Sequence, residues 1–359
     1  SNMNANEVIS TLASKFIKGK VKIHPNDHVN LCQSSNDVIP TAMHISAHSL
    51  VINELVPSLK ILKKELSKKA KAFDKIFKIG RTHLQDATPI TLGQEFSGFS
   101  EMVENSIVFI NSANMHLKSL AQGGTAVGTG INSHPKFGTL ISKEISRKVG
   151  LKFNEARNHF ESQSSKDALV QLSGTLKTAA TSLMKIGNDI RWLGSGPRCG
   201  FGEIILPAIQ PGSSIMPGKV NPVLAESLTQ VCAQVIGNDT TVSIAGQSGN
   251  FELNVMMPVM AHNIIESIQI LSSCTKIFAL DCIKGIKADK GKCEGYIEDS
   301  LAMCTSLAPI IGYNNAANVA KKAYSNNKTV REIVNEDKIL DIKESNKVLN
   351  PKSMVKPSL

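Results

Sequence analysis

The 359-residue sequence has few aromatic residues, which make up 4% of the chain and include one Trp and three Tyr. Strand-rich folds draw heavily on aromatic side chains, so this scarcity argues against a β-sandwich or β-barrel. Hydrophobic residues still make up 42% of the chain, which is enough for a sizeable core. The composition therefore favours helices that pack through Leu, Ile, Val and Ala side chains.

The seven cysteines are odd in number and contain no Cys-x-x-Cys pair. Both features argue against a disulfide framework and a zinc knuckle, and they make reduced thiols in a cytoplasmic protein the default expectation. His44 and His48 stand four residues apart, as some zinc ligands do, but no third ligand accompanies them. We therefore interpret them as ordinary helix histidines and not as metal ligands.

The sequence also lacks long apolar runs, since none approaches the roughly 18 residues of a membrane span. Residues 1–4 are polar and show no basic-then-apolar targeting signal. The net charge is +10, but many lysines flank the apolar row Leu55, Leu59, Leu62 and Leu66, which is typical of a solvated helix face. We expect no membrane and no nucleic-acid partner; a basic nucleic-acid binder would instead show salt-sensitive duplex binding.

Apolar residues recur at helical spacing over long stretches. The spacing predicts helices at 2–14, 41–73, 91–122, 166–193, 223–246 and 255–285, with a kink at Pro57. Helices of this length indicate a long bundle, and such apolar seams often pack against copies of the same chain. After about residue 290 the predicted elements become shorter. We therefore expect a central helical-bundle domain at 34–290 and a small C-terminal helical domain at 291–359.

Polar residues cluster in loops beside these helices, most densely at 212–222. This loop contains two Gly and two Pro, which exclude regular structure, together with two Ser, one Lys and one Asn, which suit an anion. Pro222 favours the first turn of the following helix, whose amides would also favour a carboxylate. An ordinary surface loop is the alternative. The Gly-rich stretch 123–130 lacks the spacing of a dinucleotide-binding loop and the Gly-Lys-Ser/Thr end of a P-loop.

Taken together, the polar clusters resemble those of class II fumarate hydratases, of the aspartase/fumarase superfamily. The matching motifs are Asn2-Met3-Asn4-Ala5-Asn6-Glu7, His24-Pro25-Asn26-Asp27, Ser34-Ser35-Asn36-Asp37, Gly80-Arg81-Thr82-His83-Leu84-Gln85-Asp86, Gly123 to Gly130 and Gly212 to Pro222. The resemblance implies an all-α homotetramer whose active sites are each shared by three subunits. It also implies the reversible hydration of fumarate to (S)-malate in the citric acid cycle, without metal or organic cofactor.

Carried over residue by residue, the resemblance implies that Ser213 removes the C3 proton of malate. His83, paired with Glu226, would manage the proton of the C2 hydroxyl or of the attacking water. The residues implied to bind the dicarboxylate are Ser34, Ser35, Asn36, Thr82, Ser214, Lys219, Val220 and Asn221. The residues that match a secondary anion site outside the main pocket are His24, Pro25, Asn26 and Asp27.

Two alternatives stay open at this point. Aspartate ammonia-lyase is one, because His28 is more typical of aspartases than of fumarases, whereas Ser35, His83 and Gly218 favour the hydratase. An inactive, truncated helical scaffold is the other. In the family a Ser/Thr-rich substrate loop precedes the Asn2-Met3-Asn4 motif, so we interpret residues 1–33 as the remnant of an N-terminal domain.

Overall fold

The computed structural model describes residues 2–18 and 20–357. The chain divides into two compact units, each built from three separate stretches of sequence. Unit 1 comprises Ser1–Lys60, Glu104–Met184 and Leu228–Thr275, and unit 2 comprises Ile61–Val103, Lys185–Ser227 and Lys276–Leu359.

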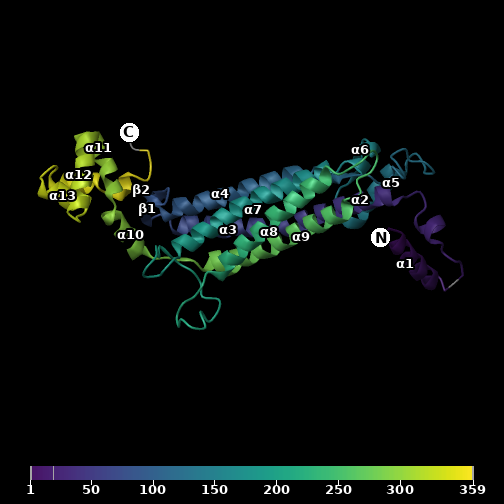
Figure 1. The fold of residues 1–359 in the computed structure, drawn as a ribbon, viewed down its shortest axis with the longest axis horizontal. Coiled ribbons are helices and arrows are strands. Elements are labelled where there is room, and N and C mark those ends of the chain that lie inside the picture. The colour runs from purple at the N-terminus through teal and green to yellow at the C-terminus, as the bar shows by residue number, and fades with distance from the viewer. Residues whose placement is uncertain (1, 19, 358–359) are drawn as a thin grey trace. The chain divides into compact units, whose positions relative to one another are not determined.

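Helices account for most of both units (Figure 1). The α-helices are α1 Asn2–Phe16, α2 Ser35–Leu50, α3 Val56–Ala72, α4 Leu92–Asn114, α5 Phe137–Val149, α6 His159–Ser164, α7 Asp167–Leu193, α8 Val223–Gly246, α9 Met257–Ile277, α10 Lys290–Asp299, α11 Ala308–Ile311, α12 Tyr313–Ser325, α13 Val330–Glu336 and α14 Ile342–Val348. Short strands pair in ladders of two: β1 Phe77–Thr82 with β2 Gln85–Thr91, β3 Ser119–Leu120 with β4 Asn154–Glu155, and β5 Ile204–Ile205 with β6 Lys287–Ala288. The prediction of an all-α fold is confirmed.

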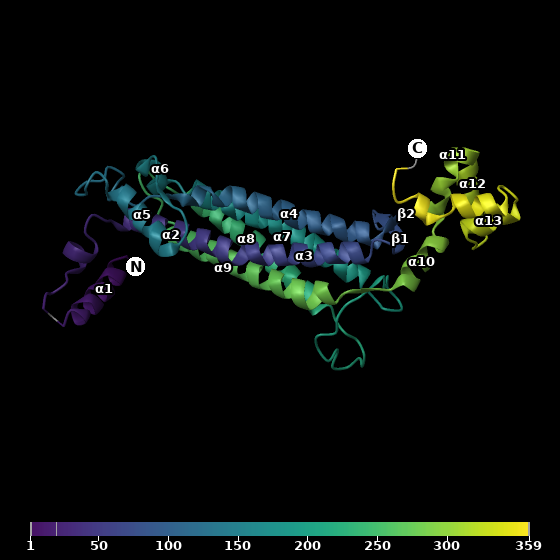
Figure 2. The ribbon, with the colours of Figure 1, turned by 180° about the vertical axis from the view of Figure 1, so that it is seen from behind.

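In unit 1 the helices α7, α8 and α9 lie side by side (Figure 2). Their apolar faces are buried; the core residues include Leu169, Leu172, Leu176, Leu228, Cys232, Val235, Ile264, Ile268 and Leu271. Buried polar pairs fix the register of the helices. Ser173 Oγ lies 2.8 Å from Asp239 Oδ1, and Asn238 Nδ2 donates to Ser267 Oγ at 3.0 Å. Because a buried polar group is costly without a partner, these bonds favour one alignment of the three helices.

The helical stretch predicted at 41–73 begins earlier and is irregular at a different point. A capping box formed by Ser34 and Asp37 starts α2 at Ser35. The irregularity is a π-helical segment, Val51–Leu55, which lies immediately before Pro57 instead of at it. Proline has no N–H and its ring clashes with the carbonyl four residues earlier, and a wider turn relieves both problems. Pro57 therefore lies near the start of a new helix, α3.

Two other segments differ from the prediction. The helix expected at 91–122 ends at Asn114, where a 3₁₀ turn, His116–Lys118, leads into β3. The polar segment 80–89 was expected to be a loop and instead forms most of the β1–β2 hairpin. Its register shifts between Ile79 and Arg81, so Gly80 lies at a bulge, where an added Cβ would approach Thr88 O to 2.8 Å. This bulge disrupts the alternation by which a strand is recognised in a sequence.

Unit 2 contains the hairpin and the C-terminal helices. A hydrophobic cluster joins them, and its buried members are Ile79, Ile297, Met303, Cys304, Leu307, Ala316, Val319, Ala323, Val330, Ile333, Val334 and Leu349. Ile79 comes from β1, whereas the other members come from the chain after residue 296. The apolar side of the hairpin is therefore covered by the short C-terminal helices. Among the residues described, none of the helices is both long and apolar enough to cross a membrane.

Gly93 offers a test of the packing between the start of α4 and the end of α3. An added Cβ at Gly93 would lie 2.5 Å from Ala70 O and 2.7 Å from Asp74 N, whereas nothing lies within 4 Å of a Cβ at Gly98 on the same helix. We expect Gly93→Ala to lower the free energy of unfolding by about 1–3 kcal/mol through overpacking. Gly98→Ala should raise it by about 0.5–1 kcal/mol, because alanine favours a helix. Denaturant titration of both variants measures the difference, and equal stabilities would contradict the packing.

Candidate active site

The N-terminus of α2 and the Gly-rich loop 123–130 meet in unit 1. Asp37 Oδ2 accepts hydrogen bonds from the amides of Gly123 at 3.1 Å and Thr125 at 2.9 Å. Asn36 Nδ2 donates to Ala126 O at 2.8 Å, and Ser34 Oγ accepts from the Asn36 amide. Two of the motifs that carry the family resemblance, about 90 residues apart in sequence, are therefore brought together within the single chain.

Asp37 is the residue at the centre of this contact, and sequence reasoning gave it no role of its own. Its side chain is fully buried. Burial raises the pKa of this carboxyl, and the amides of Ser34, Gly123 and Thr125 act in the opposite direction by donating to it. The available signal was the Ser-x-x-Asp spacing of a capping box, which predicts a helix start but not a bond to a distant loop.

The cluster predicted as a secondary anion site folds as one π-helical turn, Pro25–Val29. His24 Nδ1 accepts hydrogen bonds from the amides of Asn26 and Asp27 at 3.3 and 3.2 Å. The same Nδ1 also lies 3.2 Å from Asp27 Oδ2. His24, Asn26 and Asp27 are all exposed, so this turn presents polar groups to the surface.

Thr82 and His83 lie at the tip of the β1–β2 hairpin, in unit 2. Thr82 pairs with Gln85, so His83 and Leu84 form a two-residue turn. Both have positive φ, 56° for His83 and 58° for Leu84, the backbone geometry that such tight hairpins require. Asn and Gly usually occupy these positions, and a bulky residue such as Leu there is strained. The turn leaves the imidazole of His83 exposed.

The loop 212–222 is closed on itself by backbone hydrogen bonds. The Ser213 amide donates to Lys219 O at 2.9 Å, and the Lys219 amide donates to Met216 O at 3.1 Å. Gly212 has φ 90°, and an added Cβ would approach Lys219 O to 2.9 Å, so only glycine fits the closure. Ser213 Oγ accepts from the amides of Ile215 at 3.4 Å and Met216 at 3.3 Å. These donors favour a negative charge on the hydroxyl oxygen.

Beyond Ser213, the same loop carries the cation and the carboxamide. Lys219 Nζ donates to Asn221 Oδ1 at 2.7 Å, and Ser214, Lys219 and Val220 are exposed. Helix α8 follows directly, with the Glu226 amide bonded to Pro222 O and its side chain half-buried. The loop therefore presents a hydroxyl, an ammonium group and the start of a helix, which together suit a carboxylate.

The predicted pair of His83 with Glu226 is not formed within the single chain. Among the described residues, the His83 side chain has no hydrogen-bond partner. The pair stays a prediction about assembled subunits. A metal site is likewise not formed by the described residues, since no group of three or more His, Cys, Asp or Glu lies close enough to bind one. The candidate residues supply the imidazole of His83, the hydroxyl of Ser213 with its amide donors, and the ammonium group of Lys219. These groups suit proton transfer on an anionic substrate.

Two protein-family models together match most of the chain. A family model described as "Lyase" matches residues 1–237, and one described as "Fumarase C C-terminus" matches residues 303–356. The chain is 50% identical to "Fumarate hydratase class II" of Bacillus anthracis, over 99% of this chain and 78% of that protein. It is 51% identical to "Fumarate hydratase, mitochondrial" of Saccharomyces cerevisiae, over 99% of this chain and 74% of that protein.

Solved structures agree with the sequence relatives. The crystal structure of a recombinant class II fumarase from Schistosoma mansoni superposes with a TM-score of 0.94 at 40% identity, covering 100% of this chain and 79% of that one. A lactonizing enzyme from Pseudomonas putida shares the fold at 21% identity, with a TM-score of 0.78.

Asp37→Asn tests whether this carboxylate holds α2 and the Gly-rich loop together. Three amides converge on its two oxygens, and asparagine offers one acceptor oxygen and an NH₂ group that repels these donors. We expect the free energy of unfolding to fall by about 1–3 kcal/mol. The matched control is Asp341→Asn, because Asp341 caps α14 through one amide and asparagine is an equally good cap. Thermal unfolding compares the two; equal effects would contradict the role of Asp37.

Proposed function

The chain belongs to the class II fumarate hydratase family of lyases, and we propose how its residues perform the reaction of that family. As a class II fumarate hydratase it catalyses the reversible hydration of fumarate to (S)-malate. Removing a proton beside a carboxylate gives an aci-carboxylate intermediate with an additional negative charge. The active site must therefore supply a base for the C–H proton and an acid that protonates the hydroxyl leaving the neighbouring carbon. It must also supply fixed hydrogen-bond donors for the developing negative charge.

We assign the base to Ser213. Serine is a weak base at its ordinary acidity, so it needs donors that stabilise its alkoxide. The amides of Ile215 and Met216 already donate to Ser213 Oγ. This is the single observation that carries the assignment, because the other loop hydroxyl, Ser214, has no such donors among the described residues.

His83, paired with Glu226, is proposed to handle the proton of the hydroxyl or the attacking water. A carboxylate beside an imidazole selects one tautomer and stabilises its cation. Lys219 and Asn221 would bind one carboxylate of the substrate. The remaining proposed contacts come from Ser34, Ser35, Asn36, Thr82, Ser214 and Val220, while the turn at 24–27 would be the secondary anion site.

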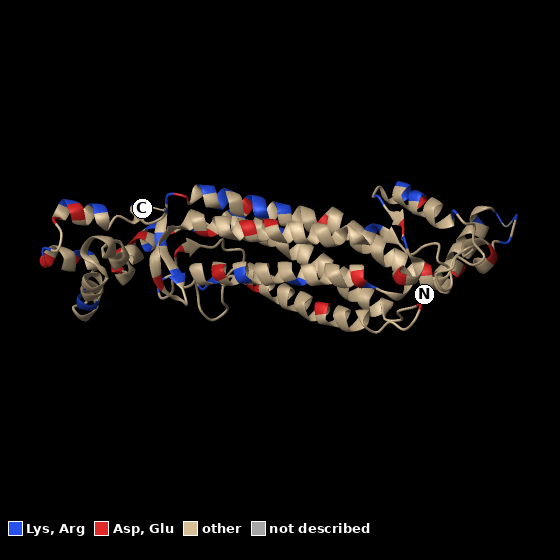
Figure 3. Ribbon diagram, turned by 90° about the horizontal axis from the view of Figure 1, so that it is seen from above, with Lys and Arg blue, Asp and Glu red and all other residues tan. Residues whose placement is uncertain are grey.

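We further propose a homotetramer in which each active site draws on three subunits. The exposed imidazole of His83 has no partner among the described residues of its own chain. Large apolar side chains are also exposed on the long helices, such as Val108 and Phe109 on α4 and Ile244 on α8. Figure 3 shows that long stretches of these helices carry neither basic nor acidic residues. Uncharged surfaces of this kind favour association with further subunits.

Two coarser expectations complete the proposal. We propose domain boundaries at residues 33 and 290, and the cluster of buried residues after 296 supports a C-terminal domain. A cytoplasmic location is supported by the cysteines, because the described structure has them all as free thiols. Comparison of the chain's activity on malate and on aspartate separates the hydratase from aspartate ammonia-lyase, since both reactions form fumarate, which absorbs in the ultraviolet.

Ser213→Ala and His83→Asn test the two proton-transfer roles. Each should lower kcat for malate by about 10²–10⁴, the usual contribution of a positioned acid or base. Ser214→Ala is the control for Ser213, because it removes a neighbouring exposed hydroxyl and should affect KM more than kcat. Fumarate formation at saturating malate gives the rates. Near-normal turnover in either variant would refute the role of that residue.

Mixing the two inactive variants tests whether the sites are shared between subunits. If His83 and Ser213 of one site come from different chains, oligomers assembled from His83→Asn and Ser213→Ala subunits contain some sites with both native residues. Activity should then reappear after the two variants are unfolded, mixed and refolded together. Refolding each variant alone is the control. No recovery in mixed oligomers of confirmed composition would show that both residues come from one chain.

A further inference from the structure

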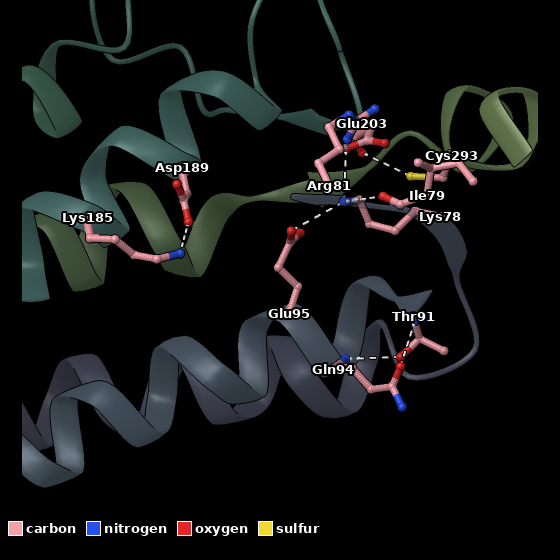
Figure 4. A network of polar contacts seen from close by, with 10 residues as sticks. All are labelled: Lys78, Ile79, Arg81, Thr91, Gln94, Glu95, Lys185, Asp189, Glu203 and Cys293. Carbon is pink, nitrogen blue, oxygen red and sulfur yellow. Dashed lines mark hydrogen bonds and ion pairs between the residues drawn. The ribbon is translucent and has the colours of Figure 1, made fainter. Parts of the chain in front are cut away.

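A buried ionic network lies directly beneath the hairpin that carries His83 (Figure 4). Glu203 is fully buried, and its Oε2 lies 2.9 Å from Arg81 Nη1 and 3.3 Å from Lys78 Nζ. Lys78, which is 1% exposed, also lies 3.3 Å from Glu95 Oε1. Two cations and two carboxylates therefore balance one another. The reaction assigned to Ser213 and His83 does not use any of these four groups.

Arg81 is held by more than its charge. Its guanidinium lies 4.2 Å from the centre of the Phe201 ring and 5.7 Å from that of Tyr296. The Tyr296 hydroxyl in turn donates to Phe201 O at 3.1 Å. A planar guanidinium suits stacking on an aromatic ring and an ion pair at the same time, and a lysine ammonium does not. The ion pair and the ring contacts together thus fix the orientation of the Arg81 side chain.

Arg81 lies on β1, the strand that leads directly into the strained turn at His83 and Leu84. Arg81 and Asp86 face each other in the hairpin, and one residue pair separates them from His83 and Leu84. Two adjacent residues with positive φ are costly for side chains of this size, by about 1–3 kcal/mol each. Such a turn persists only where its surroundings impose it. The His83 side chain makes no hydrogen bond among the described residues, so it does not hold the turn itself. The turn must therefore be held by the residues that pack against the hairpin.

Glu203 transmits the position of Arg81 to the rest of unit 2. Its carbonyl accepts from the Asp289 amide at 2.9 Å, and Asp289 caps α10. The next residues, Ile204 and Ile205, form β5 and pair with β6. The carboxylate that holds Arg81 is thus anchored through its own backbone to a strand and a helix. Neither partner of the ion pair lies on a freely moving segment.

We propose that Arg81, held by Glu203 and by the ring of Phe201, is a positioning residue for His83. It fixes the strained turn so that the imidazole points where the proton is transferred, without touching the substrate. This inference rests on the proposed role of His83. Lys78 lies between Glu95 Oε1 and Glu203 Oε2, the same oxygen that Arg81 contacts. It is expected to contribute to stability more than to the position of the turn.

The test is a double-mutant cycle on kcat with Arg81→Met and His83→Asn. If Arg81 acts through His83, Arg81→Met should lower kcat by about 10²-fold in the native background, as expected for a displaced catalytic group. The same change should have almost no further effect in the His83→Asn background. KM for malate should change much less than kcat. Arg81→Lys should restore little, because it keeps the charge but loses the stacking on the Phe201 ring.

Arg331→Met is the matched control, since Arg331 forms an ion pair with Glu298 but lies outside the hairpin and its network. It should leave kcat unchanged in both backgrounds. Circular dichroism and chromatography on every variant verify fold and assembly; if Arg81→Met does not fold, Arg81→Lys replaces it in the cycle.

Two results would overturn the inference. One is a native kcat in a folded Arg81 variant, and the other is an equal fold-loss with and without His83, which would indicate a general structural role. A failure of the proposed function is recognised separately, because His83→Asn alone would then keep its turnover.

Discussion

A buried carboxylate must be neutralised or hydrogen-bonded, and this requirement holds both halves of the proposed site in place. Asp37 meets it by accepting hydrogen bonds from amides of the Gly-rich loop, which fastens that loop to the first turn of α2. Glu203 meets it by accepting from Arg81 and Lys78, which fastens the hairpin to the segment before β5. In each case the cost of burying the charge is offset only when two distant segments stay together. The exposed polar residues nearby therefore lie on backbone segments that these buried contacts hold in place.

This arrangement separates the groups that act on substrate from the groups that hold them. The hydroxyl of Ser213 and the imidazole of His83 are accessible, and backbone contacts set the geometry of the loop and of the turn that carry them. Accessible groups on fixed backbones can be completed by other subunits without changing the fold of each chain. The long helices with exposed apolar residues offer surfaces for that assembly. An active site shared among chains is thus compatible with the way one chain folds.

The sequence was sufficient for the elements whose signals are local. The helix predicted at 223–246 has those bounds in the structure, and the one predicted at 166–193 differs by a single residue, because apolar spacing and flanking residues mark both. The hairpin was missed because the bulge at Gly80 and the polar tip conceal its alternation. Glu203 and Arg81 are far apart in sequence, and nothing in either neighbourhood indicates that they pair. Motif resemblance led to the proposal of His83 and Ser213, whereas the residues that pack against the hairpin of His83 are apparent only in the folded structure.

The hairpin tip shows why these missed residues matter. Glycine or asparagine at the positions of His83 and Leu84 would relieve the strain of positive φ, but glycine would remove the imidazole and a freely chosen turn would leave it mobile. A proton-transfer group must lie within hydrogen-bond distance of its target, and a misplacement of about 1 Å can lower the rate by about 10²-fold. Mobility is therefore more damaging to the rate than strain is to stability. The buried ion pair allows the chain to keep a strained but rigid turn. On this proposal, the stability that Arg81 and Glu203 provide is the means by which the proposed proton-transfer histidine keeps one orientation.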